Sequence, residues 1–163
     1  KKRKDDNVKR EGLKTLGDWK KVLEKLINRT AVLIDFGNGC ISCGGTNSPQ
    51  GGHMHSVKAN EALRFHLENI WLQDYHCNVK LSANIIKYNE GLRSIYGSEY
   101  QQYVECDLVR IYPTLQLRID DIKDAISKAK LVIKELEQNQ EVRTPEQRKE
   151  LRKKYNLFIG IYK

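Results

Sequence analysis

The stretch that decides the fold is "NGCISCGG", Asn38 to Gly45. It contains Cys40 and Cys43, which are separated by two residues and flanked by glycines. Such a pair is found in redox centres, in disulfides and in one half of a metal knuckle. A redox pair is expected at a strand–helix junction, whereas glycines supply the tight turns that a knuckle needs. The sequence therefore favours a metal knuckle, provided that a second half exists.

The second half of this site is "DYHC", Asp74 to Cys77, which has the same spacing. Structural zinc takes four ligands, drawn from thiolates, imidazoles and carboxylates. We predict that one zinc ion is bound by Cys40, Cys43, Asp74 and Cys77. His76 is the competing fourth ligand, although it adjoins Cys77 and adjacent residues seldom close on one tetrahedral ion. The alternative is four unrelated cysteines, and we expect Cys106, in a helical pattern, to be a buried thiol.

The charge of the chain favours an anionic partner. Its 163 residues carry a formal net charge of +8, which favours nucleic acid ahead of anionic lipid. Six of the first ten residues are basic, and we predict that this arm lies along DNA phosphates. A solvated tail or a piece of a longer basic helix is an equal alternative. The predicted phosphate contacts in the arm are Lys1, Lys2, Arg3, Lys4 and Arg10.

The cellular compartment is predicted from what the sequence lacks. It has no run of about 18 apolar residues, so we predict no membrane span. Four cysteines without a visible secretory signal fit a reducing cytosol better than a disulfide framework. We therefore expect a cytoplasmic protein.

Helical periodicity dominates on both sides of the cysteine pairs. Apolar residues predict an amphipathic helix from Asp18 to Asn28, and a long amphipathic stretch follows Pro113. Thr144 and Pro145 mark the start of a last helix. We divide the chain into a basic arm, a leading helix with a linker, a knuckle core and a C-terminal helical extension, at residues 1–12, 13–36, 37–92 and 93–163. The extension pairs with a second copy in a homodimer or folds back on its own domain.

The residues between and beside the cysteine pairs resemble the HNH, or ββα-metal, nucleases in their order. His53 lies in "GGHMHS", Asn69 in "RFHLENIW", and Asn78 follows Cys77 directly. In such enzymes a neutral imidazole takes a proton from the attacking water, and a divalent ion neutralises the developing charge. The resemblance implies His53 as general base, Asn69 as the residue that fixes the histidine loop, and Asn78 as a Mg²⁺ or Mn²⁺ ligand. A structural hairpin histidine and a helix cap remain the alternatives for His53 and Asn69.

The chain also resembles the phage NinG family, also called Rap. The resemblance rests on "CISCG", "GGHMHS", "ALRFHLENIWLQDYHCN" and "SANIIKYNEGLRSIYG", and it covers about Leu13 to Val104. It implies a phage- or prophage-encoded endonuclease, acting in a bacterial cell, that cuts branched recombination intermediates such as Holliday junctions and D-loops. The fold class is then mainly helical α+β, with a small zinc-stabilised ββα-metal centre flanked by amphipathic helices. The Cys–Asn junction is similar to that of the phage resolvase endonuclease VII, where the asparagine binds metal.

The sequence departs from these patterns at three places. Asp74 stands where the family has cysteine, and Gly52 stands where many HNH enzymes have an acidic metal ligand. His55 or a water molecule could replace that ligand, and the alternative is a site that holds its ion loosely. The segment Ser82–Ala83–Asn84 replaces Ser-Gly-Asn, and Asn84 most simply caps the next helix, with a role beside the metal as the alternative.

Two further basic residues are predicted to contact phosphates, namely Arg64 and Lys80. Arg64 has the alternative of pairing with Glu61 or Glu68, one turn away. We expect His66 at the surface or in a supporting position.

A different class of function remains open at this point. A non-catalytic, zinc-containing DNA-binding or recombination accessory module would have the same basic arm and helices. Such a module has no need of an imidazole and a cysteine-adjacent asparagine, so His53 with Asn78 favours the nuclease.

Overall fold

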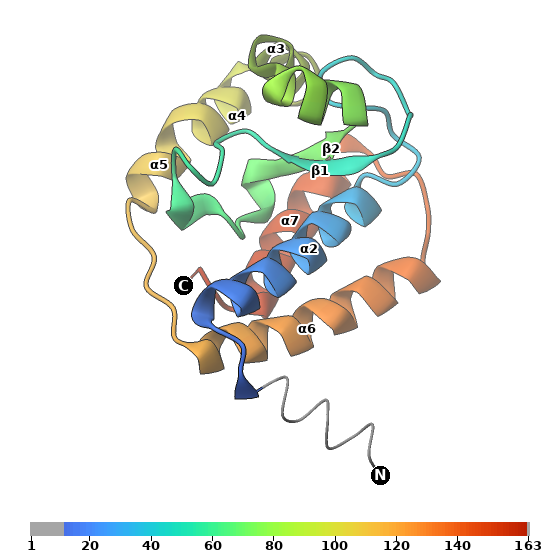
Figure 1. Cartoon of the computed structure of the whole chain (residues 1–163). Coiled ribbons are helices and arrows are strands. Elements are labelled where there is room, and N and C mark those ends of the chain that lie inside the picture. The colour runs from blue at the N-terminus through green and yellow to red at the C-terminus, as the bar shows by residue number, and fades with distance from the viewer. Residues whose placement is uncertain (1–11, 163) are drawn as a thin grey trace.

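The structure is a computed structural model that describes residues 12–162. The predicted arm contacts Lys1, Lys2, Arg3, Lys4 and Arg10 therefore lie outside the described residues. Two strands and six helices of the described chain are labelled in Figure 1. They are α2 (Leu16–Ile34), β1 (Gln50–His53), β2 (Ile70–Gln73), α3 (Ile85–Tyr96), α4 (Ser98–Gln102), α5 (Leu108–Ile111), α6 (Ile119–Gln138) and α7 (Pro145–Ile159). Shorter helical turns occupy Glu61–Leu63, Leu67–Asn69, His76–Lys80, Ser82–Asn84 and Tyr103–Asp107. This mainly helical α+β composition agrees with the predicted fold class at that level.

The leading helix α2 is longer than predicted. It begins at a capping box in which Thr15 and Asp18 bind each other's backbone N–H groups. It continues past Asn28, because Ala31, Leu33 and Ile34 extend its buried face where we had expected a linker. The helix ends at Asp35, which is buried as well.

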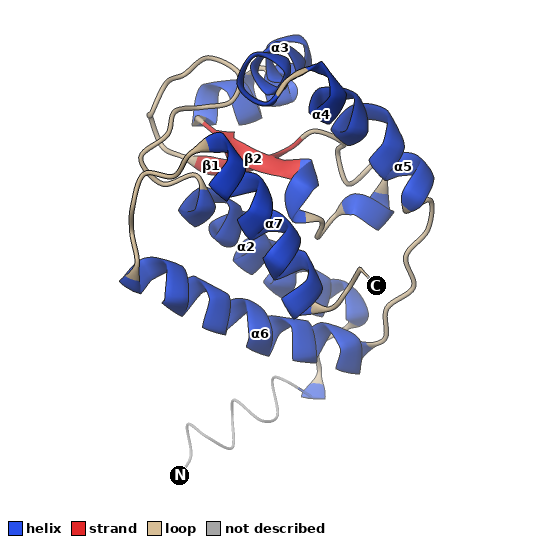
Figure 2. Ribbon diagram, turned by 180° about the vertical axis from the view of Figure 1, so that it is seen from behind, coloured by secondary structure: helices blue, strands red, loops and turns tan. Residues whose placement is uncertain are grey.

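The C-terminal helices share one apolar core with α2. In Figure 2, α7 crosses in front of α2, and α6 runs below both. The apolar face of α6 is buried in this core and is formed by Ile122, Ala125, Ile126, Ala129, Val132 and Leu136. Of the two arrangements considered for the extension, the structure shows the one that folds back on its own chain. Pairing with a second copy through another surface stays a prediction.

The boundaries of the last two helices follow from their caps. Helix α6 begins at Ile119, several residues after Pro113, where Asp121 accepts a hydrogen bond from the Arg118 backbone N–H. The predicted start of α7 is confirmed, since Thr144 caps it and Pro145 is its first residue. No helix of the described chain combines the length and the apolar composition that crossing a bilayer requires.

The hairpin is held between two helical layers (Figure 1). Strands β1 and β2 are antiparallel, with Gly52 opposite Trp71. Gly51 faces α2 so closely that a Cβ there would lie 2.8 Å from the Cα atom of Asn28. On the other face, the Tyr88 hydroxyl of α3 donates to the Gly52 carbonyl over 2.8 Å. A second core of Trp71, Tyr88, Leu92, Val104 and Leu108, among others, fills the space between the hairpin and α3–α5.

A buried ion pair connects α2, α7 and β2. Asp35 and Arg152 are 2% and 0% exposed, and two hydrogen bonds of 3.0 and 2.7 Å join them. Asp35 Oδ2 also accepts the Leu72 backbone N–H over 2.9 Å. The guanidinium of Arg152 donates to the carbonyls of Leu67 and Ile70 and stacks on Trp71. The pair therefore fixes strand β2 against the helical core.

We predict that Asp35→Asn lowers the free energy of unfolding by about 3–5 kcal/mol, because it leaves the Arg152 charge buried without a counter-charge. The matched control is Asp124→Asn, which removes an exposed partner of Lys128 and should cost less than about 1 kcal/mol. Urea unfolding measures both. If both variants lost the same free energy of unfolding, the buried pair would contribute no more to stability than the exposed one.

Candidate metal centre and histidine site

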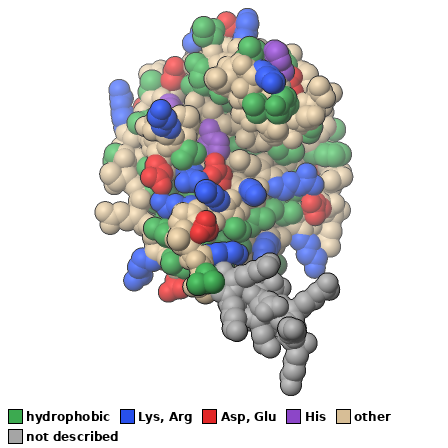
Figure 3. Space-filling view, viewed as in Figure 1, with side chains coloured by type: hydrophobic (Ala, Val, Ile, Leu, Met, Phe, Trp, Pro, Cys, Tyr) green, Lys and Arg blue, Asp and Glu red, His purple; other side chains and the backbone are tan. Residues whose placement is uncertain are grey.

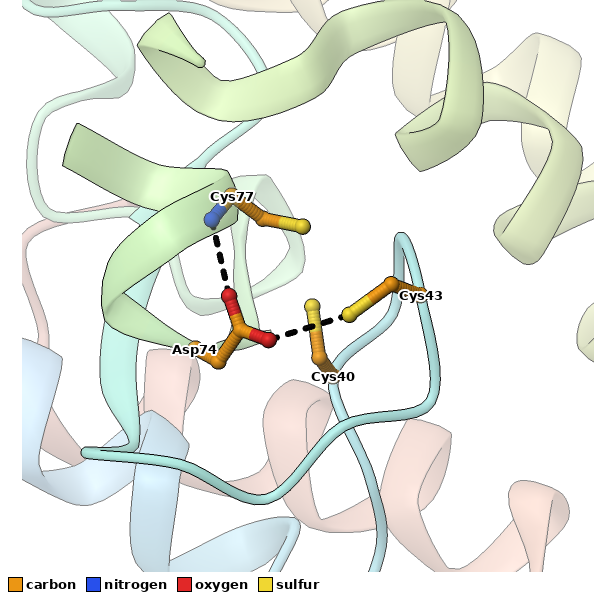
Figure 4. Close-up of side chains that lie close together, drawn as sticks. All are labelled: Cys40, Cys43, Asp74 and Cys77. Carbon is orange, nitrogen blue, oxygen red and sulfur yellow. Dashed lines mark hydrogen bonds between the residues drawn. The ribbon is translucent and has the colours of Figure 1, made fainter. Parts of the chain in front are cut away.

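The two halves of the predicted knuckle meet in space. One donor atom from each of Cys40, Cys43, Asp74 and Cys77 lies within 4.8 Å of all the others. Figure 4 shows the three sulfurs and the carboxylate converging. A tetrahedral site with zinc–sulfur bonds of about 2.3 Å has sulfur–sulfur distances of about 3.8 Å. The donor atoms lie within 4.8 Å of one another, so small rotations of the side chains would bring them to that geometry. The donor set and its spacing therefore fit a structural metal ion such as zinc.

The first half of the cluster is a tight turn whose backbone N–H groups point at the cysteine sulfurs. Cys40 N–H donates to the Gly45 carbonyl over 2.7 Å, and Gly44 N–H donates to the Cys40 carbonyl over 2.8 Å. The N–H groups of Ser42 and Gly45 point at the sulfurs of Cys40 and Cys43, each at 3.4 Å. Hydrogen bonds of this kind orient ligand sulfurs and favour the thiolate.

Asp74 belongs to the cluster in two ways. Its Oδ1 accepts the Cys77 backbone N–H over 2.7 Å, which fixes the start of the second half. Its Oδ2 accepts the Cys43 thiol over 3.0 Å, and this bond lowers the pKa of Asp74 and raises the pKa of Cys43 to about 12. His76 is exposed and lies outside the cluster. The structure thus brings Asp74, and not His76, to the three cysteines. Cys106 is half-buried rather than buried, and it is not part of the cluster.

We predict one zinc ion per folded chain, lost in Asp74→Ala and retained in His76→Ala. Cys77→Ala should also unfold the central module, since structural zinc contributes on the order of 10 kcal/mol to folding. Elemental analysis of freshly purified protein measures the zinc, and circular dichroism measures the fold. Zinc loss in His76→Ala with retention in Asp74→Ala would reassign the fourth ligand.

A strained segment follows the second half of the cluster. Ser82, Ala83 and Asn84 all have positive φ angles, which residues other than glycine adopt only at an energetic cost. Gln73 Nε2 donates to the Ala83 carbonyl over 2.7 Å, and Asn84 Nδ2 points at the Cys77 sulfur at 3.5 Å. Asn84 occupies the expected N-cap position of α3 but makes no side-chain cap bond, and its amide faces the Cys3Asp cluster instead.

We predict that Ala83→Gly stabilises the protein by about 1 kcal/mol, because it relieves the left-handed strain at φ +72°. The control is Ala59→Gly, at an exposed turn position without a positive φ, which should leave stability unchanged or lower it slightly. Thermal or urea unfolding measures the difference. A destabilised Ala83→Gly variant would contradict the assignment of strain.

His53 lies at the end of β1 with its ring already oriented. Its Nε2 lies 2.9 Å from the Arg64 carbonyl, which accepts only if that nitrogen carries the proton. The other ring nitrogen, Nδ1, makes no hydrogen bond within the described residues and keeps its lone pair. Desolvation lowers the pKa of His53, which keeps the ring neutral at neutral pH. These are the properties that a general base requires.

Asn69 fixes the backbone that follows His53. This residue is fully buried, and its Oδ1 accepts the His55 N–H over 2.8 Å. Its Nδ2 donates to the carbonyls of His55 and Leu63 over 3.0 and 3.2 Å. Asn69 ends a short helical turn and is not its cap residue. It makes the contact expected of a residue that fixes the histidine loop, while its catalytic importance stays a prediction.

Asn78 lies apart from His53. Its Nδ2 donates to Gln50 Oε1 over 2.8 Å, at the opposite end of β1, and no hydrogen bond links it to His53 within the described chain. The space beside Gly52 is filled by Gln73, whose buried Oε1 would lie 2.0 Å from a Cβ at that glycine. The His55 ring is directed to the Val104 carbonyl at 2.9 Å. This contact engages only Nε2, so the replacement of the acidic ligand by His55 stays a prediction.

Three other predicted positions have definite environments. Arg64 donates twice to Glu24 Oε2, over 2.9 and 2.7 Å, and lies 3.8 Å from Glu61, so its charge is largely compensated. Lys80 is exposed. His66 is only 2% exposed, and desolvation lowers its pKa to about 4. Our surface expectation for His66 was wrong, because Tyr112 and Tyr162 enclose its ring.

The residues that sequence reasoning missed surround Asn78. A cavity between α2 and β1 is lined by Asn78, Gln50, Lys25 and Arg29, among others. The spacing of Lys25 and Arg29, four residues apart on α2, was the available signal. Only the apolar face of this helix was used in the prediction.

The fold and the site define a class of protein, namely a mainly helical one with a two-stranded sheet and a Cys3Asp cluster that could hold a structural metal ion. The chain belongs to the phage NinG family, since the family model described as Bacteriophage Lambda NinG protein matches residues 1–141. The match includes the cluster, the hairpin and α2–α6, and it ends before α7. No curated protein and no solved structure shows significant similarity to the chain.

Proposed function

We propose that this protein is a structure-specific endonuclease that hydrolyses phosphodiester bonds in branched DNA. The observation that carries the proposal is the orientation of His53. Because Nε2 donates to the Arg64 carbonyl, Nδ1 is the basic nitrogen of a neutral ring. A neutral ring in this orientation offers Nδ1 as a proton acceptor, which is the role that the family resemblance gives to His53.

In the proposed reaction, His53 Nδ1 accepts a proton from the water that attacks the phosphorus. Asn69 keeps the following backbone in place through its three hydrogen bonds to His55 and Leu63. The burial that lowers the pKa of His53 keeps the base neutral, and therefore active, over the physiological range.

The proposed catalytic ion is Mg²⁺ or Mn²⁺, with Asn78 as a protein ligand. When bound, such an ion would neutralise the charge on the leaving oxygen, which requires that the substrate bring Asn78 and His53, at the two ends of β1, to one phosphate. Asn78 offers an amide oxygen, and Mg²⁺ commonly completes its shell with water and substrate phosphates. The Cys3Asp cluster has a structural role in this scheme, because it fixes the turn His76–Lys80 that carries Asn78.

Branched DNA is the proposed substrate because of the family and the charge. Phage NinG proteins are the relatives that the chain resembles throughout residues 1–141, and the net charge of +8 favours a polyanion. Cutting both strands of a four-way junction requires two active sites. We therefore propose that two copies of the chain act together on one junction.

A second candidate function is a non-catalytic DNA-binding or recombination accessory module. It is favoured by the absence of an acidic side chain at Gly52, whose space Gln73 fills. In this case the hydrogen bond from His53 to the Arg64 carbonyl would only stabilise the β1–β2 hairpin. The two candidates differ in a single measurable property, the rate of strand cleavage.

We predict that His53→Ala lowers the rate of junction cleavage about 10²–10⁴-fold, the usual loss for a general base. Junction affinity and zinc content should stay near wild type, because His53 is neither one of the predicted phosphate contacts nor a member of the Cys3Asp cluster. Asn78→Ala should also cut slowly and should be partly rescued by high Mg²⁺ or Mn²⁺. The assay follows a labelled four-way junction in single-turnover conditions.

The matched control is His76→Ala, which removes an exposed imidazole. It should cut at nearly the wild-type rate. His66, buried in the core, is unsuitable as a control. Wild-type cleavage by His53→Ala would reject the proposed base and support the accessory module. Zinc loss in that variant would make His53 a structural ligand.

A further inference from the structure

The cavity between α2 and β1, here called the α2–β1 cavity, has a composition of its own. Its volume is about 320 Å³. Lys25, Asn28 and Arg29 line it from α2, Gln50 from β1, and Asn78 from the turn that follows the cluster. Two cationic side chains and three carboxamides thus surround one open space.

No carboxylate lines the α2–β1 cavity. Four other cavities of the described chain each contain at least one Asp or Glu among their lining residues. Cations and amide N–H groups are the donors that proteins use for phosphate oxygens. The chemistry of this cavity therefore fits an anion with several acceptor oxygens.

The basic residues continue along the exposed face of α2. Lys21, Lys25 and Arg29 are all exposed and recur every four residues, which places them on one side of the helix. We call them the α2 basic stripe. Figure 3 shows Lys and Arg side chains gathered across the face over α2. One turn of helix, about 6 Å, separates neighbouring members of the stripe.

Three side chains that line the cavity keep hydrogen-bond donors that a bound anion can use. Gln50 uses its Oε1 to accept the Asn78 amide, so its own NH₂ group is left to donate. Lys25 forms no ion pair within the described residues. Arg29 is 3.1 Å from Glu137, but both side chains are about half exposed, so the pair is weak and a phosphate can compete for Arg29.

We propose that the α2–β1 cavity binds a backbone phosphate of a DNA strand and that the α2 basic stripe guides that strand. The proposal rests on the proposed function for the identity of its ligand. Gln50 and His53 are the two ends of β1, which separates them by about 10 Å along the strand. The cavity therefore binds a phosphate near the one that reacts at His53, and it positions the strand for cleavage.

The test compares two double variants that remove the same charge. Lys25→Gln with Arg29→Gln alters the cavity, whereas Lys130→Gln with Lys134→Gln alters two exposed lysines at the same spacing on α6. The probe is a fluorescein-labelled synthetic four-way junction, titrated at several salt concentrations. The cavity variant should bind at least about tenfold more weakly, with a salt slope reduced by about 2. The control variant should change affinity less than about threefold.

Asn28→Asp tests the sign of the ligand charge, because it adds a carboxylate with little change of shape. It should weaken junction binding, with or without Mg²⁺. Mg²⁺-dependent strengthening of junction binding that exceeds the effect of Mg²⁺ on the wild-type protein would instead identify a cation site at Asn28 and overturn the proposal. Equal losses in the two double variants would also overturn it, since they would show a response to net charge alone.

The outcomes separate this proposal from the proposed function. If wild-type protein cuts no DNA but the cavity variant loses affinity selectively, the phosphate site stands and the nuclease is rejected. If wild-type protein cuts and the cavity variant binds like the control, the phosphate site is rejected and the nuclease stands.

Discussion

The buried ion pair between Asp35 and Arg152 is the constraint on which the rest of the structure depends. Asp35 ends α2, Arg152 lies in α7, and both bind the backbone of β2. Burying two charges costs several kcal/mol per ion, and only complete hydrogen bonding offsets that cost. The arrangement is therefore stable only when α2, α7 and β2 are all in place. It determines where the hairpin lies, and so where His53 and Asn69 lie.

Arg152 also extends the structural unit beyond the family match. Residues 1–141 match the family, whereas Arg152 follows them and contacts Asp35 within them. The hairpin of the family region is thus anchored by a helix outside it. At the other end of β2, the Cys3Asp cluster serves the same purpose. Its apolar neighbourhood is small, with Leu72 packed beside Cys40 and Cys77, so a bound metal ion would add stability that packing alone does not supply.

Much of this structure was predictable because its signals are local. Helical periodicity located α2 and α6, and the Thr144–Pro145 pair marked the start of α7. The two Cys-containing pairs predicted a cluster because zinc imposes ligand number and chemistry on the sequence. The end of α2 was missed, because Arg29–Ile34 carries the same apolar face without a stop signal before Asp35.

The remaining features depend on contacts between distant residues. Asp35 and Arg152 are 117 positions apart, and Arg64 pairs with Glu24 across 40 positions, so neither partner marks the other in the sequence. His66 has an ordinary local context, and its burial follows from Tyr112 and Tyr162 in other segments. The α2 basic stripe has regular spacing, but only the approach of Gln50 and Asn78 makes a cavity beside it.

The central claim is that these anchored elements form a metal-dependent nuclease. Incubating the pure wild-type protein with an end-labelled four-way junction, in Mg²⁺, in Mn²⁺ and in EDTA, tests it most directly. The account predicts paired cuts near the branch point with either ion, no cuts in EDTA, and little cutting of a linear duplex of the same sequence. Tight, salt-sensitive binding of the junction without cleavage in either ion would contradict it.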